Sequence, residues 1–226
     1  MKIFNLKTSS QFKEKNLNLT IGNFDGIHLG HKNVIETLIN ISKKNNYKSA
    51  ILSFNPHPRE FFSKSNIPFN IITPLFKQNL FNKFGIDIYI DFLFDENLSS
   101  LAPNEFIKHI LYEKLSIKNI IIGSDFKFGK DRKGDLSLLI ENSLKYKYKV
   151  KIIEPIIDIS SKEKFSSSLI REDIKNGLFE KVTKALGRHW HMSGKVIIGD
   201  QRARKINFPT ANIEPGLQIL PLKGVY

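Results

Sequence analysis

Two histidines, His28 and His31, lie in a glycine-rich stretch that reads GNFDGIHLGH from Gly22 to His31. An apolar run over 17–21 precedes it and a helical pattern of apolar residues follows it, so we predict a strand, a turn and the start of a helix. Such a turn directs backbone N–H groups and the positive helix end toward an anion. Imidazoles spaced i, i+3 are expected on one side of the helix, with Gly30 leaving room for a phosphate. The pattern therefore predicts a site where both histidines stabilise charge on a nucleotide phosphate.

A second candidate anion site combines hydroxyl groups with an arginine. Ser166, Ser167 and Ser168 begin a helical pattern, and Arg171 follows one turn later. Serines at a helix start are often only caps, whereas the forked donors of arginine suit oxyanions. Taken alone, the stretch leaves both interpretations open. Combined with the histidine turn, it predicts a clamp for a triphosphate.

Two further loops follow predicted strands. Asn55 to Glu60 reads NPHPRE, and its two prolines are expected to stop any helix and to hold an extended loop until about Thr73. A connection of this length favours a flap that covers a substrate. The second loop runs from Gly123 to Lys130 and carries Phe126 and Phe128, for which we favour a ligand wall over a core position.

Composition limits the class of protein. The chain has 226 residues, of which 41% are hydrophobic, and it has no cysteine, which fits a cytoplasmic protein. No apolar run is long enough to cross a membrane, and no signal peptide is evident. The net charge of +13 is scattered along the chain without a block of like charges. It would favour an anionic small-molecule substrate as readily as a nucleic acid.

Alternating patterns predict an α/β fold with buried strands. Strands are expected at 17–21, 48–54, 86–91, 119–122 and 150–154, the third with one wetter face. A helix is expected from Pro74 to Gly85 with Thr73 as its cap, and others begin at Pro103 and Leu136. After Gly187 the pattern changes to short β-type runs, so about 40 residues begin an all-β module that is too short to close a barrel. From this we infer a piece of a longer chain.

Five motifs occur together and in order, and they resemble one family. They are GNFDGIHLGH at 22–31, FNPHP at 54–58, GSDFKFG at 123–129, SSSLIR at 166–171, and GD at 199–200 leading to NFPTAN at 207–212. The combination resembles the bacterial bifunctional riboflavin kinase/FMN adenylyltransferases, also called FAD synthetases. The resemblance implies a Rossmann-like nucleotidyltransferase domain over residues 1–186 and the opening strands of a riboflavin kinase barrel over 187–226.

The resemblance also implies a reaction and a set of site residues. FMN and ATP would give FAD and pyrophosphate with Mg²⁺, through attack of the FMN phosphate on the α-phosphorus of ATP. His28, His31 and Arg171 would be catalytic. The residues expected to bind ATP are Gly22, Phe24, Asp25, Gly26, Gly30, Ser166, Ser167 and Ser168. The residues expected around the flavin and its phosphate are Asn55, His57, Asp125, Phe126, Phe128 and Gly129.

In the second module, the resemblance places Thr210 and Asn212 at Mg²⁺ and ATP phosphates. The catalytic glutamate of that family would lie beyond Tyr226, so riboflavin phosphorylation is expected only of a complete chain. Some positions depart from the family pattern. Leu169 stands where an arginine is usual, and Ala203 and Asn207 stand where glycines are common, which matters wherever a positive φ is needed.

Two alternatives stay open on the sequence. One is another nucleotidyltransferase with the same histidine motif, although such enzymes lack the N-P-H-P loop and the P-T-A-N segment. The other is a basic nucleic-acid-binding protein without catalysis, which would gather its lysines on one surface. The expected partners are nucleotides and flavins, without a membrane, and the oligomeric state is unknown from the sequence.

Overall fold

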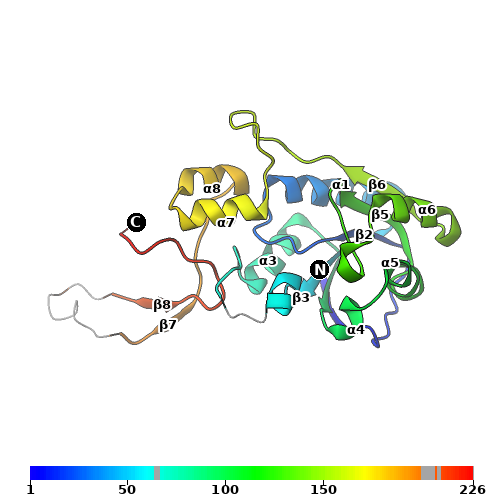
Figure 1. The fold of residues 1–226 in the computed structure, drawn as a ribbon, viewed down its shortest axis with the longest axis horizontal. Helices are drawn as coiled ribbons and strands as arrows, with labels where there is room; N and C mark the ends of the chain where they lie inside the picture. Colours follow the sequence, from blue (N-terminus) through cyan, green and yellow to red (C-terminus); the bar gives the residue numbers. More distant parts are fainter. Residues whose placement is uncertain (64–66, 200–206, 208–209, 226) are drawn as a thin grey trace.

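The computed structural model describes residues 1–63, 67–199, 207 and 210–225, and its centre is a six-stranded sheet. The strands pair in the order β1-β4-β3-β2-β5-β6, and every pair is parallel. The strands are β1 (Lys2–Leu6), β2 (Leu17–Ile21), β3 (Lys48–Asn55), β4 (Ile88–Leu93), β5 (Ile117–Gly123) and β6 (Lys149–Ile153). The α/β prediction with a parallel sheet is confirmed (Figure 1).

Helices cover both faces of this sheet. They are α1 (Leu29–Asn45), α2 (Pro58–Ser63), α3 (Pro74–Phe84), α4 (Glu96–Ser99), α5 (Pro103–Glu105), the π-helical η1 (Phe106–Lys114), the short 3₁₀ turn η2 (Lys130–Arg132), α6 (Leu136–Tyr146), α7 (Ser167–Lys175) and α8 (Phe179–Leu186). Thr73 caps α3 as predicted, because its side chain accepts a hydrogen bond from the Phe76 amide at 3.3 Å.

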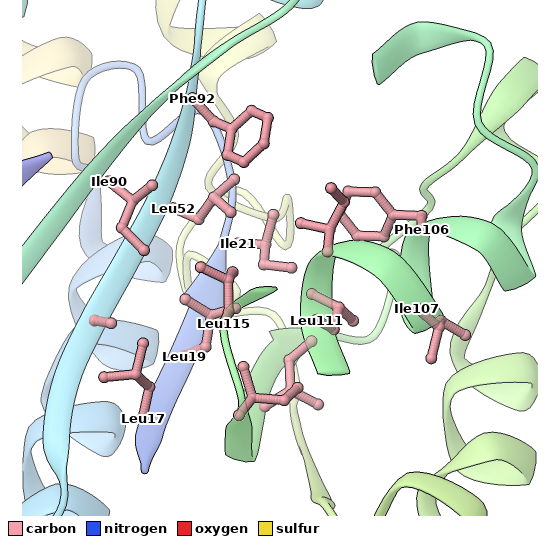
Figure 2. Packing of buried hydrophobic residues seen from close by; sticks show 14 of the residues in the cluster. Leu17, Leu19, Ile21, Leu52, Ile90, Phe92, Phe106, Ile107, Leu111 and Leu115 are labelled. Atoms are coloured by element: carbon pink, nitrogen blue, oxygen red, sulfur yellow. The ribbon is translucent and has the colours of Figure 1, made fainter. Parts of the chain in front are cut away.

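Two apolar clusters lie on opposite faces of the sheet. On one face, odd-numbered residues of β2 pack with η1, and Figure 2 shows Leu19 and Ile21 near Phe106 and Leu111. On the other face, Ile51 packs with side chains of α1, α3, α7 and α8. β2 is buried along its whole length, as expected for a central strand covered on both sides.

The direction of the chain reverses beside β2. From β2 the chain moves outward through β3 and β4, whereas β5 lies on the other side of β2 and continues to β6. In open α/β sheets, ligands bind beyond the carboxyl ends of the strands at such a reversal. The turn with His28 and the loop after Gly123 both leave the sheet there.

Several local predictions were wrong. The prolines after Asn55 do not prevent a helix, since α2 begins at Pro58, where proline fits the first helical position because its N–H is not needed. The strand β1 was not predicted. Tyr89, expected on a wetter face, is buried against Phe81 at a ring-centroid distance of 5.3 Å, because α3 covers that face of β4.

Phe128 was also assigned wrongly, because it belongs to the core. Its side chain is 6% exposed and packs against Phe106. Gly134 lies so close that an added Cβ would stand 2.8 Å from the ring. Phe126 stacks on Phe128 at 5.6 Å and is only partly buried, so it stays a candidate ligand contact.

The C-terminal segment forms a two-stranded antiparallel sheet of β7 (Lys195–Ile197) and β8 (Asn212–Glu214), drawn away from the main sheet in Figure 1. The expected β module is present as this hairpin. The chain then returns to the segment before α3, where the Phe69 and Asn70 amides donate to Leu217 O at 2.9 and 3.0 Å. The Gln218 side chain also donates to Ile71 O at 3.0 Å.

Among the described residues, no helix has the length and apolar character that a membrane crossing requires.

The core position of Phe128 gives a stability prediction. Phe128→Ala should lower the free energy of unfolding by about 3–5 kcal/mol, because it leaves a cavity between η1 and the loop. Phe126→Ala, at a partly buried ring, should cost less than half of that. Urea denaturation of both variants measures the difference, and equal costs would contradict the core assignment.

Candidate functional site

The two histidines lie together at the start of α1. His28 is the N-cap residue, and its Nδ1 accepts a hydrogen bond from the His31 amide at 3.4 Å. The rings stack with centroids 3.8 Å apart and an interplanar angle of 22°. An acceptor role for Nδ1 leaves the proton of the neutral ring on Nε2 of His28. The turn therefore supplies a fixed imidazole donor beside the backbone N–H groups of the helix start.

Both imidazoles are neutral at physiological pH. Burial lowers the pKa of His28 from 6.5 to about 4, against a smaller opposing effect of Asp125. Burial likewise lowers the pKa of His31 well below its usual value, and the charges of Lys77 and Arg171 lower it further. The pair can therefore donate hydrogen bonds to a phosphate without a cost for burying its own charge.

The glycine loop before these histidines is held in an uncommon backbone conformation. Phe24 and Ile27 have φ values of 50° and 44°, and Gly26 has a φ of 88°. A positive φ is strained for a β-branched residue, so surrounding contacts must fix it. Arg188 does so by donating to Ile27 O at 3.1 Å and to Gly26 O at 2.5 Å. Sequence reasoning missed this arginine.

Glycines in the loop serve close packing. At Gly30 an added Cβ would stand 3.0 Å from the His28 ring, and at Gly22 it would stand 3.2 Å from the Phe24 ring. Gly30 therefore permits the orientation of His28. Phe24 is buried and packs against His31 at 5.1 Å, so it supports the imidazole from within the core.

Asp25 and Arg171 form a buried ion pair. Arg171 Nη2 donates to Asp25 Oδ2 at 2.6 Å, and the side chains are 12% and 7% exposed. Asp25 also accepts from the Ile71 amide at 2.9 Å and from the Ile72 amide at 3.3 Å. The guanidinium lies 3.9 Å over the Phe69 ring. This pair joins the glycine loop, the segment 69–72 and α7.

The three serines occupy different environments. Ser166 is the N-cap residue of α7 and accepts from the Leu169 amide at 3.2 Å. Ser167 donates to Asp25 O at 2.7 Å, and Ser168 is exposed. Two serines thus have structural contacts, and one of them ties the start of α7 to the glycine loop.

Of the predicted flavin residues, Asn55 ends β3 and contacts a polar group on β4, and His57 follows it. Asn55 Nδ2 donates to Asp91 Oδ2 at 3.1 Å, and Tyr89 OH donates to Asp91 Oδ1 at 3.4 Å. His57 Nδ1 accepts from the Arg59 amide at 3.0 Å. Burial and the charges of nearby cations lower the His57 pKa to about 4.

On the loop after β5, Asp125 is exposed and pairs with Lys164 at 3.0 Å, which ties this loop to the segment before α7. Gly129 has a φ of 70°, and an added Cβ would stand 2.9 Å from Pro103 Cα. Gly129 is therefore required by the loop itself.

Lys77 is a site residue that the sequence analysis missed. Its Nζ donates to Asn23 O at 3.3 Å and to Ser53 Oγ at 3.0 Å. Burial lowers the pKa of Lys77. A signal was present, because Lys77, Leu80, Phe81 and Phe84 follow the i, i+3, i+4, i+7 spacing of one helix face.

The predicted metal-binding residues of the second module are both exposed. Thr210 precedes β8, and Asn212 is its first residue, lying against Gly199. Asn207 has a φ of 60°, which asparagine tolerates where glycine is usual. Ala203 lies outside the described residues. Across the described part of the chain, no cluster of three or more His, Asp or Glu could hold a metal.

The histidine pKa gives a prediction for stability against pH. Between pH 6.5 and about 4, the unfolded chain binds a proton at His28 that the folded chain does not, so stability falls as the pH falls through this window. The His28 contribution lost by pH 4 is about 3 kcal/mol.

Urea denaturation across this pH range should show that the free energy of unfolding falls less steeply with falling pH in His28→Asn than in the parent chain. Lys83→Met, at an exposed lysine in the last turn of α3, is the control and should keep the parent slope. An unchanged slope in His28→Asn would contradict the neutral, buried state of this ring.

Comparisons with known proteins match the two parts of the chain separately. A family model described as FAD synthetase matches residues 10–169, and one described as riboflavin kinase matches residues 186–226. A bifunctional riboflavin kinase/FMN adenylyltransferase of Buchnera aphidicola subsp. Schizaphis graminum is 42% identical over 208 residues, which cover 92% of this chain and 66% of that relative. The Escherichia coli K12 protein of the same name is 32% identical, with 96% and 69% covered.

The chain thus spans about two-thirds of the length of these curated relatives. Among solved structures, the crystal structure titled macrolide-efflux protein from Streptococcus pneumoniae superimposes with a TM-score of 0.84 at 25% identity, covering 99% of this chain and 73% of that one.

Proposed function

Because the chain belongs to the FAD synthetase family, we propose that it acts in FAD biosynthesis by transferring AMP from ATP to FMN, which releases pyrophosphate. The observation that carries this proposal is the stacked pair of neutral imidazoles at the start of α1, joined through Asp25 to the start of α7. Two helix N-termini beside one glycine loop suit the phosphates of one nucleotide.

The chemical step needs no protein nucleophile. An oxygen of the FMN phosphate forms a bond to the α-phosphorus of ATP, and the bond to the pyrophosphate oxygen breaks with its electron pair. In the transition state, negative charge increases on the oxygens around the α-phosphorus. His28 and His31 are proposed to stabilise this charge through their N–H groups. Catalysis then consists of positioning and charge stabilisation.

The triphosphate is proposed to lie between the glycine loop and α7. Ser168 is exposed and available to a ligand, whereas Ser166 and Ser167 keep the helix start in place. Arg171 is assigned mainly a positioning role, because Asp25 and Phe69 already accept from its Nη2 and Nε. Its other N–H groups would serve the β- and γ-phosphates.

The flavin is proposed to lie over the loops that follow β3 and β5. Asn55 and His57 supply polar groups there, and Phe126 offers a partly buried ring for a planar ligand. The ion pair of Asp125 with Lys164 connects the β5 loop to the segment before α7, and we place this connection at the border of the flavin site. Phe128 and Gly129 fix the β5 loop by packing against Phe106 and Pro103, rather than by contacting the flavin.

Magnesium is proposed as the companion of the nucleotide phosphates. The exposed Thr210 and Asn212 side chains offer hard oxygen donors of the kind that Mg²⁺ accepts, and these residues would hold it in the kinase module. When bound, the ion neutralises phosphate charge. Riboflavin phosphorylation to FMN is proposed only for a chain that carries the remaining riboflavin kinase domain.

Incubation with FMN, ATP and Mg²⁺ tests the proposal directly. We expect FAD and pyrophosphate in equal amounts, and His28→Asn should lower kcat by about 10²–10³-fold because one transition-state donor is lost. His109→Asn serves as the matched control and should keep the parent rate.

Absence of FAD from the parent chain, together with salt-dependent binding to nucleic acid, would favour the alternative of a basic binding protein. A normal kcat in His28→Asn would remove the proposed role of that residue.

A further inference from the structure

The cations near the two histidines differ in how their charges are balanced. Arg171 is neutralised by its ion pair with Asp25 at 2.6 Å. The imidazoles are neutral because burial lowers their pKa values. Lys77, in contrast, donates hydrogen bonds only to neutral oxygens, Asn23 O and Ser53 Oγ, and the carboxylates of Asp91 and Asp25 act on it only at longer range. Within the described part of the chain, no carboxylate lies within ion-pair distance of its Nζ.

Asp91 and Asp25 compensate the burial of Lys77 only in part, because the pKa of its ammonium is still lowered by desolvation. The ammonium is carried on the inward face of α3 and is partly buried beneath the glycine loop. Desolvating a charge is unfavourable unless an opposite charge compensates it. An ammonium has three N–H donors, and the two hydrogen bonds to Asn23 and Ser53 leave one for a ligand.

Lys77 also joins two parts of the site, because its Nζ donates to Asn23 O in the glycine loop and to Ser53 Oγ near the end of β3. Its charge acts on His31, on the side proposed for the α-phosphate, and on His57, on the side proposed for the flavin phosphate. The reaction must bring two phosphate anions together, and like charges repel more strongly in the low dielectric of a protein site than in water. A cation between the two phosphates offsets that repulsion.

We propose that Lys77 binds the phosphate of FMN and holds it against the α-phosphorus of ATP. This inference rests on the proposed function, and it makes Lys77 the residue that distinguishes FMN from riboflavin, which lacks the phosphate. Lys77 keeps its proton throughout. The FMN oxygen gains the bond to phosphorus, and pyrophosphate leaves with the electron pair of the broken bond.

The test compares Lys77→Met, Lys77→Arg and the control Lys83→Met, which alters an exposed lysine in the last turn of α3. Steady-state FAD formation is measured with FMN and ATP varied separately. Lys77→Met should raise KM for FMN about 10–100-fold, as expected for one lost charge-assisted hydrogen bond, with KM for ATP within about twofold of the parent. Lys77→Arg should recover part of this loss, and Lys83→Met should behave as the parent.

Equal increases in both KM values, or an unchanged KM for FMN, would overturn the proposal. If Lys77→Met does not fold, Lys77→Arg decides, because a longer forked cation should still raise KM for FMN selectively. Failure of the parent chain to form FAD would count against the proposed function itself. FAD formation by the parent with unaltered FMN kinetics in the variants would count against the role of Lys77 alone.

Discussion

The buried ion pair between Asp25 and Arg171 is the interaction on which the arrangement of the site depends. A single carboxylate accepts from the guanidinium of α7 and from the amides of Ile71 and Ile72. Such a pair is costly to desolvate, and removing one partner leaves an uncompensated buried charge. The glycine loop, the segment 69–72 and the start of α7 are therefore fixed relative to one another, although 146 residues separate the two side chains in the sequence.

The same connection reaches the C-terminal module. Ile71 donates its N–H to Asp25, while its carbonyl oxygen accepts from Trp190 at 2.9 Å and from Gln218 at 3.0 Å. Both latter residues belong to the part of the chain that matches riboflavin kinase. Ile71 thus contacts the C-terminal part of the chain through its carbonyl group and supports the proposed nucleotide site through its N–H group. Packing of the C-terminal part therefore contributes to the geometry of that site.

Local patterns predicted the fold well where they were strong. The buried run of β2, the glycine turn and the threonine cap of α3 follow from short-range rules, and the structure has them where they were expected. β1 was missed because it is a short edge strand whose apolar residues Ile3, Phe4 and Leu6 follow no strict alternation. α2 was missed because two prolines were taken as breakers, although the second of them begins the helix.

The site was harder to predict, because its contacts join distant segments. The motifs indicated His28, His31 and Arg171, but no local rule pairs Arg171 with Asp25 or predicts that both imidazoles are neutral. Lys77 was overlooked because lysines on helices usually face solvent. Phe128 was placed at a ligand because its flanking glycines suggested an open loop, whereas one of the glycines nearby, Gly134, makes room for its ring in the core.

A double-mutant cycle on the ion pair tests this account most directly. Asp25→Asn, Arg171→Met and the double variant would be unfolded in urea alongside the parent chain. We expect each single change to cost about 3–5 kcal/mol, and the double change to cost at least about 2 kcal/mol less than their sum, because the second substitution removes the charge that the first left unpaired. Costs that add to within about 0.5 kcal/mol would show that the two side chains do not depend on each other, and would contradict the account.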